Sequence, residues 1–437
     1  MRTNRKVDAR QNRTHEGGRA FSNLTSLQQL RRSILSCLLW ENTFYESGAS
    51  IADRITDLAA QCDPEKVAEL AIEARQMYHL RHAPLLLLKV LARTGAGRTD
   101  GLVRTTIPRV ISRADEISEF LALYWKDGKT PISGQVKKGL AAAFKNFDAY
   151  QIAKYNRDYA VKLRDVMFMV HPKPDGSSET LYQKVADKEK VDSPDTWEVA
   201  LSGGADKKET FERLIRSDKL GGLALLRNLR NMDQAGVDRD LVREALRKGK
   251  FGRVLPFRFV AAARACPQLE PDIDKALLRK LKAEEPLSGK TIVLVDVSGS
   301  MDCQLSAKSD LNRMDAAATL ASVVTGDIRV FTFSERVVEV PARRGMAGVD
   351  AITHSQSHIG TLLGQAIRTI NKEKHDRLIV ITDEQSHDSV PDPVCNNCYL
   401  INVASYQNGV GYGKWVHIDG FSERVINYIR ELERLAD

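Results

Sequence analysis

The stretch TIVLVDVSGSM, Thr291 to Met301, decides the fold of the second part of this chain. It is an apolar run rich in β-branched residues and it reaches Asp296, which is the pattern of a buried strand. Helical stretches such as Met314 to Val324 and Leu362 to Asn371 alternate with three later runs of the same kind, which are Ile328 to Phe333, Arg377 to Thr382 and Asn397 to Val403. This alternation predicts an open, Rossmann-like, mostly parallel sheet covered by helices on both faces.

Polar residues stand where two of these strands end. Asp296-Val-Ser298-Gly-Ser300 follows the first run, and Asp383 follows the run that ends at Thr382. In open parallel sheets, ligands bind beyond the carboxyl ends of the strands. One carboxylate and two hydroxyls on alternate positions of a turn can converge on a hard divalent cation such as Mg²⁺, which prefers oxygen ligands. The alternative is a capping turn in which these side chains only bond the local backbone.

This motif resembles the metal-ion-dependent adhesion site of von Willebrand factor A domains. The resemblance implies a divalent cation, Mg²⁺, faced by Ser298, Ser300 and Thr361, with Asp296 and Asp383 bound directly or through water. The chain has Ile359 where the family commonly has a glycine before this threonine. A single hydroxyl-rich site without a second metal or an obvious base does not imply hydrolysis.

The residues before this part have helical periodicity. Apolar positions recur at spacings of three and four from Ser26 to Lys282, and Gly and Pro interrupt them at short intervals. Many short amphipathic helices suit an α-solenoid of HEAT-type helix pairs, and a plain helical bundle is the alternative. We expect PLSGK, residues 286–290, to be a linker, so the predicted domains are a helical domain over residues 1–285 and an A-like domain over residues 286–437.

Charge is distributed unevenly between these two parts. Residues 286–437 hold 15 Lys plus Arg against 19 Asp plus Glu, a formal charge of −4, whereas residues 1–285 hold 50 against 38, which gives +12. A positive field of this size attracts polyanions such as nucleic acid or an acidic membrane surface, although a solvated basic face has the same composition.

One stretch of the helical part interleaves cations with aromatic residues such as Tyr155 and Tyr159. Lys and Arg neutralise phosphates, and Tyr or His can stack on unpaired bases, so this mixture suits RNA; an ordinary solvated helix face is the alternative. The candidate RNA-binding residues are Lys137, Lys138, Lys154, Arg157, Lys162, Arg164, His171 and Lys173.

Composition excludes several classes of protein. The chain has 437 residues, of which 43% are hydrophobic and 28% charged, and no apolar run approaches the ~20 residues of a membrane span. Its basic N-terminus has no apolar signal region. Six cysteines in so long a chain are not a disulfide framework, so we expect reduced thiols and a cytoplasmic protein. Cys395-Asn-Asn-Cys398 has the spacing of half a zinc or redox site, and two reduced thiols beside a strand is the simpler interpretation.

Helical repeats followed by an A domain, together with several sequence blocks, resemble the Ro ribonucleoprotein autoantigen family, also called TROVE-domain proteins. The resemblance covers nearly the whole chain. The blocks that carry it are THEGGRAF (14–21), KYNRDYAVKLRDVMFMVHPKP (154–174), LALLRNLRNM (223–232), FRFVAAARA (257–265), DVSGSM (296–301) and the closing HIDGFSERVINYIREL.

The resemblance implies a ring of helical repeats closed by the A domain, in a bacterial or phage member of the family. It also implies two RNA ligands, small noncoding Y-like RNA on the outer basic surface and single-stranded 3′ ends of misfolded RNA in the ring. The resemblance places the family's outer lysine and histidine at Lys154 and His171. At the position of a family arginine this chain has Asp158, and Arg157 lies next to that position. This departure predicts an altered affinity for Y-like RNA. Arg227 is the candidate for the ring interior.

The function that follows is a noncatalytic, monomeric, RNA-binding ribonucleoprotein component, with an exoribonuclease or RNA ligase as a possible protein partner and no membrane. A protein-interaction scaffold that uses the metal without RNA is the alternative. A metal-dependent nuclease is disfavoured because no acidic cluster for two metals stands in the sequence.

Overall fold

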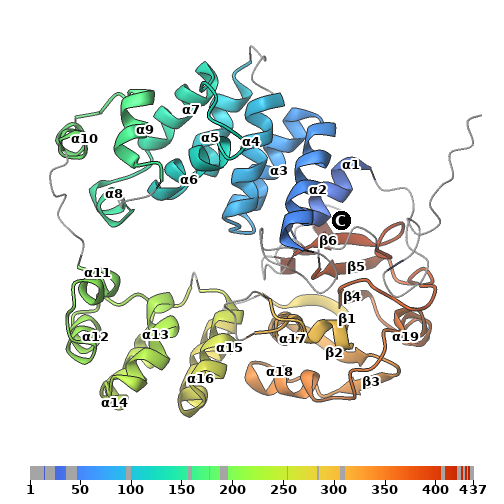
Figure 1. The fold of residues 1–437 in the computed structure, drawn as a ribbon. Coiled ribbons are helices and arrows are strands. Elements are labelled where there is room, and N and C mark those ends of the chain that lie inside the picture. The colour runs from blue at the N-terminus through green and yellow to red at the C-terminus, as the bar shows by residue number, and fades with distance from the viewer. Residues whose placement is uncertain are drawn as a thin grey trace, which may run out of the picture. The chain divides into compact units, whose positions relative to one another are not determined.

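The computed structural model describes residue 14 and residues 25–35, 47–94, 100–155, 160–176, 178–187, 195–252, 254–282, 285–305, 311–404, 409–420, 425–426, 429–430 and 432–433. The chain divides into two compact units (Figure 1). Unit 1 comprises 1–25, 35–51 and 207–437, and unit 2 comprises 26–34 and 52–206. The division of the sequence into domains at residue 286 stays a prediction.

Unit 2 is built of short helices, as the breakers in the sequence predict. Local capping explains where some of them begin: Asp63 accepts a hydrogen bond from the Glu65 amide ahead of Pro64, and Ser133 caps the helix that follows it. The helices are α1 (Ser26–Leu35), α2 (Gly48–Gln61), α3 (Pro64–Gln76), α4 (His82–Thr94), α5 (Leu102–Val110), α6 (Ala114–Tyr124), α7 (Gly134–Phe144), α8 (Ala149–Tyr155), α9 (Leu163–Val170), α10 (Glu179–Ala186) and α11 (Trp197–Ser202).

The helices of unit 2 stack in pairs. Each of α3, α4, α5 and α7 packs against the helix two positions further along the chain. Buried or half-buried ion pairs join successive pairs, as between Arg75 of α3 and Glu116 of α6, whose side chains lie 2.6 Å apart. This arrangement is the helical repeat predicted from the periodicity, and it differs from a plain bundle, in which all helices share one core.

Unit 1 begins with further helical repeats. They are α12 (Lys207–Arg216), α13 (Gly222–Gln234), α14 (Arg239–Lys248), α15 (Pro256–Ala265) and α16 (Glu270–Leu281), with a 3₁₀ turn, η2 (Pro267–Leu269), between the last two. Helix α15 packs against α17 (Arg313–Val323) of the α/β part. Arg264 of α15 reaches both Asp315 and Asp350, and Asp274 of α16 accepts from the Met346 amide at 2.9 Å.

The α/β part of unit 1 is a six-stranded sheet with the order β3-β2-β1-β4-β5-β6 (Figure 1). Among the described strands, only β2 and β3 pair antiparallel; the other neighbouring strands are parallel. The strands are β1 (Leu287–Asp296), β2 (Gly326–Phe333), β3 (Val337–Val340), β4 (Arg377–Thr382), β5 (Asn397–Asn402) and β6 (Val416–Asp419), and the helices beside α17 are η3 (Gly299–Asp302), α18 (Met346–Thr353) and α19 (Leu363–Ile370).

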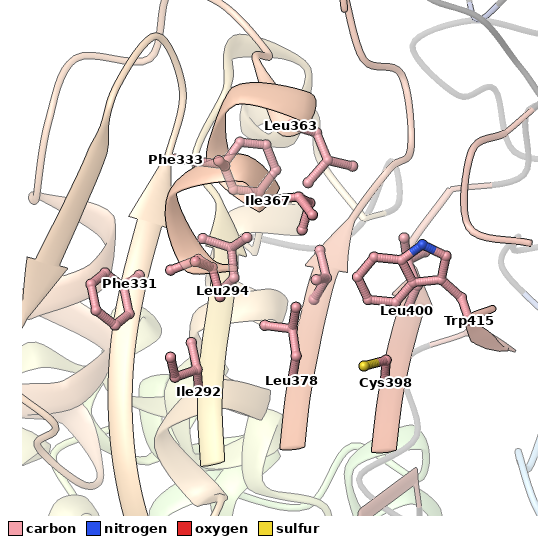
Figure 2. Packing of buried hydrophobic residues seen from close by; sticks show 13 residues of the cluster. Ile292, Leu294, Phe331, Phe333, Leu363, Ile367, Leu378, Cys398, Leu400 and Trp415 are labelled. Atoms are coloured by element: carbon pink, nitrogen blue, oxygen red, sulfur yellow. The ribbon is translucent and has the colours of Figure 1, made fainter. Parts of the chain in front are cut away.

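Each face of the sheet buries alternate residues of the strands, because successive side chains of a strand point to opposite faces. Leu294 of β1 and Leu378 of β4 lie in one hydrophobic cluster with Leu363 and Ile367 of α19 (Figure 2). Helix α17 packs against β1 and also meets α15 and α18, so all of its residues are buried. The sheet is therefore covered by helices, as predicted.

The segment expected to be a linker is part of a strand. Strand β1 starts at Leu287, and its register with β2 shifts between Leu287 and Lys290. Gly289 takes a φ of 71° there, and the Lys290 amide donates to Asp376 at 2.7 Å. The Gly and Ser residues of this segment are typical of linkers, which is why a linker was expected. In the structure they form an irregularity within the strand instead. In the described part of the chain, no helix combines the length and apolar character that a bilayer crossing requires.

Candidate metal site and nucleic-acid interface

The predicted metal ligands lie at the carboxyl ends of the two central strands. Asp296 is the last residue of β1, and Asp383 directly follows β4, its neighbour in the sheet. Ser298 and Ser300 lie in the turn and in η3 after β1, and Thr361 lies just before α19. Because β1 connects to β2 on one side and pairs with β4 on the other, this edge is the switch point of the sheet, where ligands bind.

Hydrogen bonds hold the first three of these side chains together. Asp296 accepts from the Ser298 amide at 2.9 Å through Oδ1 and from the Thr382 hydroxyl at 2.6 Å through Oδ2. The Oγ atoms of Ser298 and Ser300 lie 3.2 Å apart. All five predicted ligands are buried, with none more than 9% exposed.

Two loops bring Thr361 to the same edge. The His387 amide donates to the Thr361 carbonyl at 2.9 Å, and His387 lies four residues beyond Asp383. Ser334, directly after β2, accepts from the amides of Ile359 and Gly360 and donates to the Gly360 carbonyl. Thr382 and Ser334 therefore position the predicted ligands. Sequence reasoning did not find either residue, because single hydroxyls after a strand are common.

The electrostatics of the site favour a cation. Burial, together with the smaller effect of the charge of Asp383, raises the pKa of Asp296 to about 7. Arg313 Nη1 lies 4.0 Å from Asp383 Oδ2, too far for a hydrogen bond. Two buried carboxylates beside hydroxyl oxygens form the donor set that Mg²⁺ prefers, so the residues fit the predicted ion. Among the described residues, no cluster of three or more His, Cys, Asp and Glu side chains suggests another metal site.

A second buried polar cluster lies beside the site and was not predicted. Glu384 takes a φ of 62° and accepts from the Gly411 amide at 2.6 Å. Its other oxygen lies 3.0 Å from His417 Nε2, and His417 Nδ1 lies 3.5 Å from Asp419 of β6. The cluster joins the ends of β4 and β6. Thr14, far away in the sequence, donates to the Ser386 carbonyl at 2.6 Å and so is anchored next to the predicted ligands.

The structure corrects the expectation of reduced thiols at one pair of cysteines. Cys395 and Cys398 are joined in a disulfide at the start of β5. Of the described cysteines, Cys62, Cys266 and Cys303 are free. Cys398 belongs to the buried hydrophobic cluster that contains Leu363 and Ile367 of α19 (Figure 2), and the partly buried Cys395 packs against this cluster.

Most of the predicted RNA-binding residues lie on α7, α8 and α9 of unit 2. Lys137 and Lys138 are exposed on α7, and exposed Lys162 precedes α9. His171 caps the C-terminal end of α9 with a φ of 48°, and Lys173, two residues further on, is exposed. Arg157 and Asp158 lie outside the described residues. Arg227 is on α13, which belongs to unit 1.

The two remaining cations of the group are already engaged. Lys154 Nζ lies 3.3 Å from Glu198 Oε1 of α11, and close to the rings of Tyr150 and Tyr155. Arg164 donates to the Ala186 carbonyl at 2.6 Å. These contacts fix the positions of both cationic groups before any ligand binds.

Exposed aromatic rings accompany these cations, and sequence reasoning did not single them out. Tyr150 is 48% exposed and Phe168 is 51% exposed. The guanidinium carbon of Arg164 lies 4.8 Å from the centre of the Phe168 ring, and that of Arg113 lies 4.5 Å from the centre of the Tyr155 ring. Arg164 and Phe168 are four residues apart on one helix, a spacing that could have indicated the pair.

Fold and site together define a helical-repeat protein with a von Willebrand A-like α/β domain. The TROVE domain family model matches residues 182–324. "Telomerase protein component 1" of Mus musculus is 36% identical over 90 residues, and its counterpart from Rattus norvegicus is 34% identical over 90 residues. Each of these matches covers 19% of this chain, which spans only about 3% of the length of either relative.

A solved structure extends the likeness over the whole fold. The Ro (RSR) protein of Deinococcus radiodurans superimposes with a TM-score of 0.60 and 17% sequence identity, covering 93% of this chain and 99% of that one. The TROVE match over part of the chain and the likeness to a Ro protein fold agree with the family resemblance that the sequence blocks carry.

Proposed function

We propose that this chain is a noncatalytic RNA-binding component of a ribonucleoprotein. The observation that carries the proposal is the group of exposed aromatic rings and fixed cations on α8 and α9, which we call the aromatic-basic face: Tyr150, Lys154, Arg164, Phe168 and His171. Cations bind phosphates, and exposed rings stack on bases that are not paired, so a surface that holds both favours RNA with unpaired segments.

The proposed ligand of this face is a structured, Y-like noncoding RNA. Lys137, Lys138, Lys162 and Lys173 add positive charge on the neighbouring helix and loops. Single-stranded 3′ ends of misfolded RNA are the second proposed ligand, bound elsewhere on the chain. RNA processing, quality control or repair in the cytoplasm, with an exoribonuclease or RNA ligase as partner, is the role we propose.

The α/β part is proposed to hold Mg²⁺ separately from RNA. Asp296, Ser298, Ser300, Thr361 and Asp383 would hold the ion, because their oxygens are buried at one edge of the sheet. The ion would supply a fixed positive charge that balances the two carboxylates. RNA contacts are proposed for the basic part of the chain, so the two sites have separate roles.

The test is to purify the full chain without nuclease treatment and to sequence the RNA that accompanies it. The proposal predicts enrichment of particular small, structured RNAs over the total cellular RNA. The proposal would be contradicted if the co-purified RNA had the same composition as total cellular RNA, or if no RNA accompanied the protein.

One observation favours a second candidate function, the capture of an acidic protein segment at the metal site. Ile359 is 71% exposed and lies two residues before Thr361, so an apolar side chain borders the predicted ion. A partner carboxylate could complete the metal coordination while neighbouring apolar groups cover Ile359. This function predicts binding that depends on Mg²⁺ and on Ile359, with little response to salt.

A further inference from the structure

Helix α17 begins beside the predicted metal ligands. Asn312 caps it: the Asn312 side chain accepts from the Asp315 amide at 2.7 Å, and the Asp315 side chain accepts from the Asn312 amide at 3.4 Å. The Arg313 amide donates to the Cys303 carbonyl at 3.0 Å, directly after η3, the turn that carries Ser300. These bonds fix the backbone of Arg313 relative to the loop that follows β1.

The side chain of Arg313 is buried and faces Asp383. Its Nη1 atom lies 4.0 Å from Asp383 Oδ2, and the two side chains are 5% and 0% exposed. A guanidinium group stays protonated in proteins, so this residue carries its charge into the interior. Because a buried charge is costly unless an opposite charge lies close to it, Asp383 stabilises Arg313 and Arg313 stabilises Asp383.

The two carboxylates of the predicted site therefore differ in their surroundings. Neutral groups hold Asp296, which accepts from the Ser298 amide and the Thr382 hydroxyl. Asp383 accepts from the Gln385 amide at 3.2 Å through Oδ1, whereas its Oδ2 atom faces the guanidinium group. A positive charge that belongs to the chain itself is thus present at one of the predicted ligands.

The acidic residue of the first turn of α17 is engaged on another side of the helix. Asp315 takes part in the cap of α17, and its side chain lies 3.6 Å from Arg264 of α15. Arg264 also pairs with Asp350 of α18 at 3.2 Å. The first turn of α17 therefore directs one charged residue to the helical repeats and the other, Arg313, to the metal site.

We propose that Arg313 competes with the metal cation for Asp383 and so sets the affinity of the site for Mg²⁺. In the metal-free chain the guanidinium group balances the charge of Asp383. Binding of Mg²⁺ places two positive groups beside one carboxylate, and their repulsion is screened little because the site is buried. The proposal rests on the Mg²⁺ site of the proposed function and adds the residue that tunes it.

This role differs from that of a residue that helps to hold the metal. A group that supports the ligands strengthens binding, whereas a competing charge weakens it. A site with reduced affinity changes its occupancy with the concentration of free Mg²⁺, while a tight site stays filled. Arg313 would thus make the occupancy of the site responsive to the cation supply. Sequence reasoning did not find Arg313, because it lies 70 positions from Asp383 and only the fold brings the two together.

The first experiment measures Mg²⁺ binding to the full chain by isothermal calorimetry at constant ionic strength. Arg313→Gln removes the charge and is expected to bind Mg²⁺ at least about tenfold more tightly than the wild type, because a like charge at this distance shifts such equilibria by about one to three powers of ten. Arg313→Lys keeps the charge and should stay within about threefold of the wild type. Arg329→Gln, which removes the same charge from an exposed pair with Glu339 on β2, should change the affinity less than about twofold.

Thermal melts of the same variants distinguish competition from a purely structural role. With a chelator, Arg313→Gln should melt below the wild type, because it leaves Asp383 buried beside no opposite charge. In saturating Mg²⁺ the difference should shrink, since the metal charge then lies beside Asp383. Arg313→Met, a second neutral variant that fits an apolar environment, should behave in the same way. An equal drop in melting temperature with and without Mg²⁺ would overturn the proposal.

The outcomes separate this proposal from the metal site itself. If the wild type binds Mg²⁺ and both neutral variants bind it equally or more weakly, the proposal fails and the site stands. If the neutral variants bind Mg²⁺ and the wild type does not, the proposal stands and the Mg²⁺ site proposed for the wild type fails. If no form of the chain binds Mg²⁺, both fail. If the neutral variants do not fold even in Mg²⁺, Arg313 is a structural residue and the proposal is wrong.

Discussion

Lys154 Nζ lies 3.3 Å from Glu198 Oε1, so the lysine that we propose as an RNA contact is paired with a carboxylate within its own unit. The two side chains are 20% and 29% exposed. A phosphate that binds Lys154 must therefore compete with Glu198. This pair predicts a weakened contact with Y-like RNA, in addition to the altered affinity that Asp158 predicts from the sequence.

Glu198→Gln is expected to strengthen the binding of structured RNA. The substitution removes the negative charge that competes for Lys154, and half-exposed ion pairs of this kind are worth up to about 1 kcal/mol, so the gain is about two- to fivefold. Glu209→Gln, an acid on α12, is the control for a change of net charge. A gel shift with one structured RNA measures both variants. Equal gains in the two would show that the Lys154 pair has no specific role.

Phe168→Ala is expected to weaken binding of RNA that contains unpaired bases. Stacking of a base on an aromatic ring contributes about 1–3 kcal/mol, so the loss should be at least about fivefold. Phe168→Trp should retain the affinity, because it keeps the ring. Met77→Ala, which also removes an exposed apolar side chain of unit 2, should have no effect. Equal affinities of Phe168→Ala and the wild type would contradict a stacking role.

Lys154→Ala combined with His171→Ser is expected to separate two RNA ligands. The double variant should bind a structured Y-like RNA more weakly and should still bind an RNA with an unpaired 3′ tail, because other residues are proposed to hold the tail. Competition between the two RNAs on the wild type, measured in parallel, shows whether they share a site. If the double variant loses both RNAs together, the assignment of these two residues to a distinct surface is wrong.

Asp296→Asn is expected to abolish Mg²⁺ binding and to leave RNA affinity within about twofold of the wild type, since Asp296 lies in the acidic part of the chain. Asn retains the shape and one oxygen but not the charge that holds the cation. Isothermal calorimetry with Mg²⁺ and an RNA gel shift measure the two effects. An equal loss of RNA binding would contradict the separation of the two sites.

The same substitution also has a pH-dependent consequence for stability. The pKa of Asp296 is about 7 in the folded chain and about 4 when unfolded, so without metal the folded state holds an additional proton between these values. The free energy of unfolding therefore falls as the pH rises through this window. Above about pH 7, the stability contributed by the additional proton on Asp296 is completely lost. Thermal melts with a chelator should show this fall for the wild type and a smaller one for Asp296→Asn. Identical pH profiles would contradict the raised pKa.

Much of the α/β part could be predicted from the sequence, because its central strands are buried on both faces and read as continuous apolar runs. The predicted runs correspond to β1, β2, β4 and β5. The two edge strands were missed. Three of the four residues of strand β3 are half-exposed or exposed, and Val340 alone of these four is buried. Strand β6 is four residues long and contains the polar His417, so neither strand has the apolar pattern of a central strand.

The candidate metal site could be predicted where its residues stand at or directly after the end of a strand in the sequence. Asp296 and Asp383 stand next to strand ends, which a sequence shows directly. Contacts between distant residues were not predictable: the bond of Thr382 to Asp296 spans 86 positions, and the Lys154 to Glu198 pair joins α8 to α11. The disulfide of Cys395 and Cys398 depends on how the turn before β5 folds, which spacing alone does not determine.

RNA binding is the central claim, and a salt titration of the full wild-type chain tests it most directly. Affinity for one structured RNA with a single-stranded tail is measured by anisotropy between about 50 mM and about 200 mM salt. Several phosphate contacts release condensed counterions, so the account predicts a loss of affinity of about 100-fold or more across this range. An affinity that stays constant with salt, or no binding at the lowest salt, would contradict it.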